Sequence, residues 1–216
     1  MTIDQQKQRA AEAAAQLVSD GMTVGLGTGS TVAFLLPALA RMNLSIRCVA
    51  TSIDTARKAA ELGIQVDPVD TQDTLDIAID GADQVTPDGW LIKGGGGAHT
   101  REKIVAASAT RFVVIADSTK PVDALRSPVP VELLSFGLQA TLRQLGQVHL
   151  RTGFPPSPDG GVIADYHGPV DNPAALAAWL AATPGVVGHG LFEPSITSDV
   201  LIGYDDRVEH RALRPS

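Results

Sequence analysis

The segment DIAIDGADQVTPDGWLIKGGGGAHTREK, residues 76–103, organises the chain. It begins with a short apolar run that ends at Asp80 and Asp83, and it continues through Lys93 and four consecutive glycines to Glu102. Glycine is the most costly residue to order in a fold. A run of four glycines therefore indicates a backbone that approaches another group closely. The segment predicts a buried strand followed by a functional loop and then a helix.

Helical and strand patterns alternate through the first half of the chain. Helices are predicted at residues 5–17, 32–41, 54–62 and 101–109, and strands at 22–26, 46–50, 64–66, 75–79 and 112–116. This alternation predicts an α/β fold, with a Rossmann-like, largely parallel sheet covered by helices. Ligands of such sheets bind beyond the carboxyl ends of the strands. The loops after residues 26, 79 and 116 are therefore the candidate ligand loops.

The composition changes near the Ser127-Pro128-Val129-Pro130 segment. Beyond it, the patterns predict helices at 133–145 and 173–182 and strands at 148–151, 162–166 and 186–192. This order predicts a smaller α+β lobe of the ferredoxin-like type with an antiparallel sheet. The apolar run 199–203 is expected to return to the first sheet. The predicted domains are residues 1–129 plus 199–216, and the lobe 130–198.

Composition excludes several classes of protein. The chain has 216 residues and a formal net charge of −7, which argues against general nucleic-acid binding. It contains neither a signal-peptide pattern nor an apolar stretch long enough to span a membrane, so a cytoplasmic protein without a membrane partner is expected. Its one cysteine, Cys48, lies in an apolar run and is interpreted as a small buried side chain rather than a nucleophile.

The sequence Gly27-Thr28-Gly29-Ser30-Thr31 follows a predicted strand and precedes a predicted helix. Backbone N–H groups and hydroxyls at a helix N-terminus stabilise anions, so this loop is a candidate phosphate site. It lacks the lysine of a P-loop and the third glycine of a dinucleotide fingerprint. An ordinary strand–helix turn is the alternative. Lys120, in the loop after residues 112–116, is a second candidate for anion binding, and a solvated surface lysine is its alternative.

Seven motifs in order resemble the ribose-5-phosphate isomerase A family. They are GTGST at 27–31, DGAD at 80–83, KGGGGA at 93–98, TREK at 100–103, ADSTK at 116–120, PVPVE at 128–132 and PGVV at 184–187. Each motif alone is weak evidence, but the ordered set covers nearly the whole chain. The resemblance implies a Rossmann-like main domain with an inserted small α/β lobe. It also implies interconversion of D-ribose 5-phosphate and D-ribulose 5-phosphate in the pentose phosphate pathway.

The resemblance also implies residue roles. Glu102 matches the general base, and Asp80, Asp83 and Lys93 match groups that open the sugar ring and stabilise the oxyanion. The matching substrate-binding positions are Thr28, Gly29, Ser30, Thr31, Gly81, Ala82, Gly94, Gly95, Gly96 and Lys120. No metal and no organic cofactor are implied. The implied partners are a small sugar phosphate and a second copy of the chain in a homodimer, with a tetramer as the larger alternative.

Two positions depart from the family pattern. Gln84 stands where the family commonly has Glu, and His99 where it commonly has Leu. His99 is interpreted as a partly exposed loop side chain, with a role beside Glu102 as the alternative. Without the resemblance, Glu102 is an ordinary acid in the first turn of a helix. Rival functions are a non-catalytic sugar-phosphate sensor, a sugar-phosphate deaminase and a CoA transferase.

Overall fold

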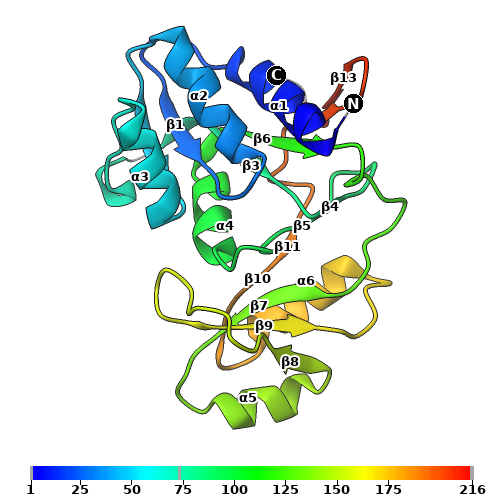
Figure 1. Cartoon of the computed structure of the whole chain (residues 1–216). Helices are drawn as coiled ribbons and strands as arrows, with labels where there is room; N and C mark the ends of the chain where they lie inside the picture. The colour runs from blue at the N-terminus through cyan, green and yellow to red at the C-terminus, as the bar shows by residue number, and fades with distance from the viewer. Residues whose placement is uncertain (1, 73, 215–216) are drawn as a thin grey trace. The chain divides into compact units, whose positions relative to one another are not determined.

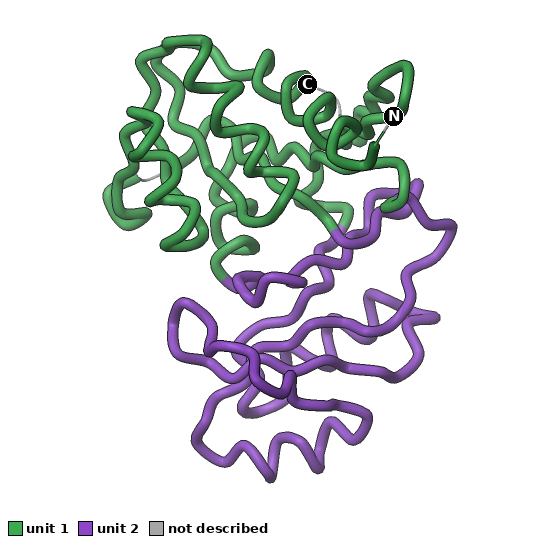
Figure 2. The backbone as a smooth tube through the Cα atoms, in the orientation of Figure 1, with its two compact units in different colours: residues 1–82, 101–120, 194–216 green, residues 83–100, 121–193 purple. Residues whose placement is uncertain are grey.

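The computed structural model describes residues 2–72 and 74–214. The chain divides into two compact units, the first made of residues 1–82, 101–120 and 194–216 and the second of residues 83–100 and 121–193 (Figure 2). The second unit therefore contains segments 83–100 and 121–129, which the sequence predicts in the first domain. A compact unit is defined by its internal contacts and need not coincide with a domain, so the predicted domain limits stay a prediction.

The first unit is built on a six-stranded sheet with the strand order β13-β12-β6-β3-β1-β2. Figure 1 labels β1, β3, β6 and β13 of this sheet. All neighbours pair in parallel except β12 and β13, so the predicted largely parallel sheet is confirmed. Its elements are α1 (Ile3–Ala15), β1 (Thr23–Leu26), α2 (Val32–Met42), β2 (Arg47–Ala50), α3 (Ile53–Glu61), a 3-10 turn (Val69–Thr71), β3 (Leu75–Gly81), α4 (His99–Ala107), β6 (Ala109–Asp117), β12 (Asp199–Gly203) and β13 (Val208–Ala212). The first two residues of α4 belong to the second unit.

Helices cover both faces of this sheet. Val24 and Leu26 of β1 are fully buried in a cluster with residues of α1 and α2. Gly25 points to the opposite face because side chains alternate along a strand. A Cβ at Gly25 would lie only 2.5 Å from the side chain of Val105, so α4 packs directly on the strand there. Burial on both faces explains why the strands read as nearly continuous apolar runs.

The second unit contains a four-stranded antiparallel sheet with the order β10-β7-β9-β8. Its elements are β4 (Gln84–Val85), β5 (Leu91–Ile92), β7 (Val129–Leu133), α5 (Leu138–Leu145), β8 (Val148–Leu150), β9 (Val162–Tyr166), α6 (Pro173–Ala182), β10 (Val186–His189) and β11 (Leu191–Phe192). From β7 to β10 the chain runs β-α-β-β-α-β, which is the ferredoxin-like order. The predicted small α+β lobe is thus confirmed. A three-stranded sheet, β11-β5-β4, completes this unit.

Three predicted elements are wrong. The strand predicted at 186–192 is divided into β10 and β11, which belong to different sheets. Residues 64–66 form no strand, only a single bridge between Val66 and Cys48. The helix predicted at 133–145 begins at Leu138, because Val129–Leu133 is a fully buried strand and Gly137 has a left-handed backbone. Strand β13 was not predicted, since its half-exposed sequence lacks a clear apolar alternation. None of the described helices is both long and apolar enough to cross a membrane.

Candidate active site

In the first unit, Asp80 is held by the backbone of two loops. It follows Ile79 near the end of β3 and is 3% exposed. Its Oδ1 accepts hydrogen bonds from the N–H of Gly81 (2.7 Å) and the N–H of Thr28 (3.1 Å). A Cβ at Gly27 would lie 1.9 Å from the same oxygen, so only glycine lets β1 and the carboxylate approach this closely. The structure therefore brings the GTGST loop and the DGAD loop together at Asp80.

Hydroxyl groups surround the GTGST loop. Oγ1 of Thr28 lies 2.7 Å from Oγ1 of Thr51, and Thr55 donates its hydroxyl to the carbonyl of Gly27 at 3.0 Å. Gly29 has a φ of 121°, a backbone angle that residues with a side chain rarely adopt. The chain then enters α2 at Val32, with Gly29 and Ser30 exposed. An exposed loop of this kind before a helix N-terminus is suited to an anion.

Glu102 lies in the first turn of α4 and is 4% exposed. Helix α4 begins at His99, two residues before the start predicted at residue 101. The hydroxyl of Thr100 donates to the buried carboxylate of Glu132 at 2.5 Å. A carboxylate buried as deeply as that of Glu102 is uncommon without a structural or functional reason.

Lys120 follows β6 in a tight turn and is half-buried. Its backbone N–H donates to the carbonyl of Asp117 at 3.2 Å. The side chain of Asp117, 1% exposed, orders the same turn by accepting from the N–H of Thr119 at 2.9 Å. The turn thus fixes the backbone at Lys120, the predicted anion-binding lysine.

In the second unit, Asp83 and the glycine loop are joined directly. The N–H of Gly95 donates to Oδ2 of Asp83 at 2.9 Å. The loop closes as a turn in which the N–H of Gly97 donates to the carbonyl of Gly94 at 3.0 Å. Lys93, which precedes the loop, is 2% exposed, and its ammonium lies 5.5 Å from the ring centroid of Phe192. This distance is within the range of a cation–π contact.

The two departures from the family pattern have physical explanations in the second unit. The Gln84 side chain both donates to the carbonyl of Arg126 (2.7 Å) and accepts from its N–H (2.8 Å), a pair of bonds that a carboxylate would only half make. His99 is wrongly interpreted above as a partly exposed loop residue: it is fully buried at the start of α4. A Cβ at Gly94 would lie 2.7 Å from its Nδ1, so the ring packs directly under the glycine loop.

One residue that contacts this loop was missed in the sequence. Arg151 donates from one guanidinium nitrogen to the carbonyls of Gly94 (3.1 Å) and Gly95 (2.9 Å). The two remaining nitrogens bind Asp165 at 2.8 and 2.7 Å. Arg151 lies more than 50 residues from the glycines in the chain, so no local spacing signals the contact.

The predicted site residues are divided between the units. Thr28 to Thr31, Asp80 to Ala82, Glu102 and Lys120 belong to the first unit, and Asp83, Lys93 and Gly94 to Gly96 to the second. Among the residues the structure describes, no three His, Cys, Asp or Glu side chains are arranged to hold a metal ion.

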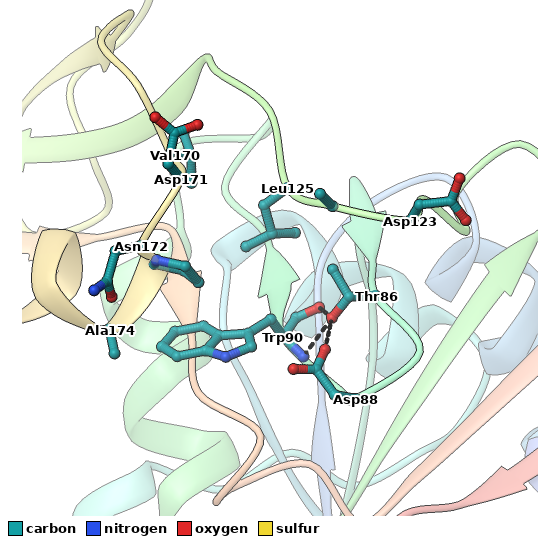
Figure 3. A pocket seen from close by; sticks show the side chains of 11 residues that line it. Thr86, Asp88, Trp90, Asp123, Leu125, Val170, Asp171, Asn172 and Ala174 are labelled. Atoms are coloured by element: carbon teal, nitrogen blue, oxygen red, sulfur yellow. Dashed lines mark hydrogen bonds between the residues drawn. The ribbon is translucent and has the colours of Figure 1, made fainter.

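A separate pocket of about 490 Å³ lies within the second unit (Figure 3). Trp90 and Leu125 line it together with Asp88, Asp123 and Asp171. The hydroxyl of Thr86 bonds the carboxylate of Asp88 at 2.5 Å and accepts from the N–H of Trp90 at 2.9 Å, which fixes one wall. None of the predicted site residues lines this pocket, so it is distinct from the predicted site.

The fold and these loops define an α/β enzyme of the Rossmann-like class, with carboxylates, hydroxyls and glycine amides in the loops that follow its strands. The family model for ribose 5-phosphate isomerase A (phosphoriboisomerase A) matches residues 47–207. The chain belongs to this family. A second model, the DeoR C-terminal sensor domain, matches residues 3–67 only.

Relatives match over nearly the whole chain. Ribose-5-phosphate isomerase A of Roseiflexus castenholzii is 46% identical and aligns over 94% of both chains. The Caulobacter vibrioides enzyme is 44% identical over 96% of this chain and 98% of its own. The crystal structure of ribose 5-phosphate isomerase A from Neisseria gonorrhoeae superposes with a TM-score of 0.94 at 34% identity, covering 99% of each chain. A D-ribose-5-phosphate isomerase in complex with phospho-erythronic acid gives 0.93 at 34% identity, covering 98% of this chain and all of its own.

Proposed function

We propose that the chain interconverts D-ribose 5-phosphate and D-ribulose 5-phosphate, an aldose–ketose isomerisation of the pentose phosphate pathway. The observation that carries this proposal is the match to ribose-5-phosphate isomerases A over at least 94% of the chain. The ordering of Asp80 by two backbone N–H groups and of Asp83 by Gly95 supports it, since both carboxylates are held in fixed positions.

Glu102 is proposed as the general base. It removes the proton from C2 of the open-chain aldose, leaves a cis-enediolate, and returns the proton to C1, while the proton of the C2 hydroxyl passes to O1 to give the ketose. One carboxylate suffices for the transfer between the carbons, because the proton taken from C2 is the proton given to C1. The position of Glu102 in the first turn of α4 places it at the helix N-terminus, and its burial keeps competing water away.

Asp80, Asp83 and Lys93 are proposed to open the sugar ring and to stabilise the oxyanion that develops. Donors fixed before the reaction stabilise such charge without reorganising at the moment of reaction. Lys93 supplies a positive charge, and the amides of Gly94 to Gly96 supply N–H groups. We propose that the substrate is bound by the loop from Thr28 to Thr31 and by Lys120. The hydroxyls of the loop, the helix N-terminus that follows it and the ammonium of Lys120 are all suited to the phosphate of the substrate.

The test is ribulose 5-phosphate formation from ribose 5-phosphate in the presence of EDTA. Turnover is expected, and it should be unchanged by the chelator. A purified, folded chain that forms no ribulose 5-phosphate would contradict the proposed activity. A chain that loses turnover to EDTA and regains it with added divalent metal would contradict a reaction without a metal.

The partial match to a sensor domain favours one alternative, a protein that binds a sugar phosphate without converting it. The two functions separate in one experiment, because a sensor gives a saturable calorimetric signal with ribose 5-phosphate and no product. From the resemblance, we also infer a homodimer in the cytoplasm. Sedimentation equilibrium tests the dimer, since a monomer at micromolar concentration would contradict it.

A further inference from the structure

Arg151 binds two backbone carbonyls of the glycine loop, residues 94–97, and is not one of the predicted site residues. It follows β8, and its guanidinium reaches the carbonyls of Gly94 and Gly95 through one nitrogen. Asp165, on the neighbouring strand β9, occupies the other two nitrogens in a bidentate pair. Both side chains are less than a fifth exposed, at 16% and 18%. A planar guanidinium held by a bidentate carboxylate has little freedom to turn.

This contact determines the direction of two N–H groups. A trans peptide is planar, so its N–H points away from its C=O, and among the described residues the one cis bond is Ser127–Pro128. Because the Gly94 carbonyl points at Arg151, the Gly95 N–H points away from it, and there it meets Asp83 at 2.9 Å. Because the Gly95 carbonyl also points at Arg151, the Gly96 N–H points away too.

Two successive N–H groups turned to the same side form a concavity that binds anions. The first donor is used by Asp83. For the second, the N–H of Gly96, no acceptor is found among residues 2–72 and 74–214, and Gly96 is exposed. The loop thus offers one donor that orders a carboxylate and one donor available to a ligand.

The last glycine of the loop, Gly97, is also packed against a side chain. A Cβ at Gly97, whose φ is 73°, would lie 2.7 Å from the ring of Phe154. The guanidinium carbon of Arg151 lies 5.0 Å from the centroid of that same ring. Arg151 and Phe154 therefore contact each other, and both lie against the glycine loop.

We propose that Arg151, oriented by Asp165, is a positioning residue of the isomerase reaction. It holds the peptides of the glycine loop so that Gly95 fixes Asp83 and Gly96 presents its N–H to the developing oxyanion of the substrate. This inference rests on the proposed function and adds to it a residue that does not touch the substrate.

The test compares Arg151→Met with Arg111→Met. Arg111 makes an equivalent bidentate pair with Asp199 at 2.7 and 3.0 Å, in the other unit and without contact to the glycines. Arg151→Met is expected to lower kcat roughly 10- to 100-fold with KM changed less than about threefold, since small misplacement of catalytic groups costs about that much. Arg111→Met should lose stability to a similar degree and keep its kcat.

Two further measurements distinguish a positioning role of Arg151 from a general loss of stability in its variants. Methylguanidinium added to Arg151→Ala should restore part of kcat, while Arg111→Ala should not respond. The amide proton of Gly95, followed by NMR, should exchange faster in Arg151→Met than in the wild type and in Arg111→Met. A folded Arg151→Met with wild-type kcat, or with unchanged Gly95 exchange, would overturn the proposal.

The amide measurement does not depend on turnover. If the wild type converts no ribose 5-phosphate, the proposed function fails, and Gly95 exchange still decides whether Arg151 holds the loop. If the wild type is active but the Arg151 variants match the Arg111 variants in kcat and in Gly95 exchange, the proposed function stands and the positioning role is refuted.

Discussion

Gly27→Ala should disrupt the site at Asp80 more severely than its size suggests. The new Cβ would lie 1.9 Å from Oδ1, 2.0 Å from Cγ and 2.5 Å from Cβ of Asp80. The clash therefore involves the base of the side chain and not only its flexible end. To reach ordinary van der Waals contact, near 3.4 Å, Oδ1 must retreat by about 1.5 Å. A retreat of that size breaks the hydrogen bonds from Thr28 and Gly81.

The cost follows from those two bonds. Hydrogen bonds to a charged group are worth about 1.5–3 kcal/mol each, and Asp80 is almost fully buried, so screening by water is small. A loss of about 3 kcal/mol or more in the free energy of unfolding is expected. In a chain of this size it corresponds to a fall in Tm of roughly 6–12 °C, which calorimetry measures directly.

Gly81→Ala is the matched control for stability. Its Cβ would meet its nearest atoms at 3.9 Å, an ordinary contact, and its N–H would still donate to Asp80. A change within about 0.5 kcal/mol is expected for such a site. If Gly27→Ala melts within about 2 °C of Gly81→Ala, the close approach of Gly27 and Asp80 does not hold the carboxylate and the reasoning is refuted.

Three further predictions concern charge and burial. Burial alone would raise the pKa of Asp199, but hydrogen bonds from Arg111 and His210 outweigh it and lower the pKa below its usual value. The ionised form therefore stabilises the fold above the unfolded-state pKa of about 4, and this contribution is lost as pH falls through the folded pKa. Asp199→Asn should cost about 1–3 kcal/mol at pH 7 and progressively less as pH falls below about 4, and a cost independent of pH in urea titrations would contradict this. Burial, with a smaller contribution from Asp67, raises the pKa of the Cys48 thiol to about 12, so the native protein should not react with a thiol reagent at pH 8, and prompt labelling would show the thiol to be accessible. Lys120→Ala should raise KM for ribose 5-phosphate several-fold with kcat within about threefold, and an unchanged KM would argue against a phosphate contact.

The sequence predicted the parallel sheet well because its strands are buried on both faces. Runs such as Leu75–Ile79 and Phe112–Ala116 show that burial directly in their composition. Helix α6 was predicted with its observed limits, because Asn172 caps it, Pro173 begins it and Pro184 follows it closely. Local signals of this kind determine local structure.

The errors arise where tertiary contacts outweigh local pattern. Leu133 continues an apolar run into a predicted helix, yet pairing with Val162 makes it the end of strand β7. Strand β13 depends on its partner β12 rather than on its own alternation.

The candidate site shows the same division. Asp80, Asp83, Lys93 and Glu102 stand in recognisable motifs, and these residues were named from the sequence. Arg151 stands in no such motif, because it contacts the glycine loop from a distant part of the chain. Glu132 ends the PVPVE motif, but nothing in that motif signals its contact with Thr100. Burial of His99 was also unpredictable, since the close packing of its ring against Gly94 exists only in the folded chain.

The proton transfer assigned to Glu102 is the central claim, and Glu102→Gln tests it most directly. The amide keeps the size of the side chain and removes the base, so kcat should fall about 10²- to 10⁴-fold, the usual contribution of general acid–base catalysis. The Kd for ribose 5-phosphate, measured by calorimetry, should stay within about threefold of the wild type. A Glu102→Gln variant that retains near-wild-type kcat would show that another group moves the proton.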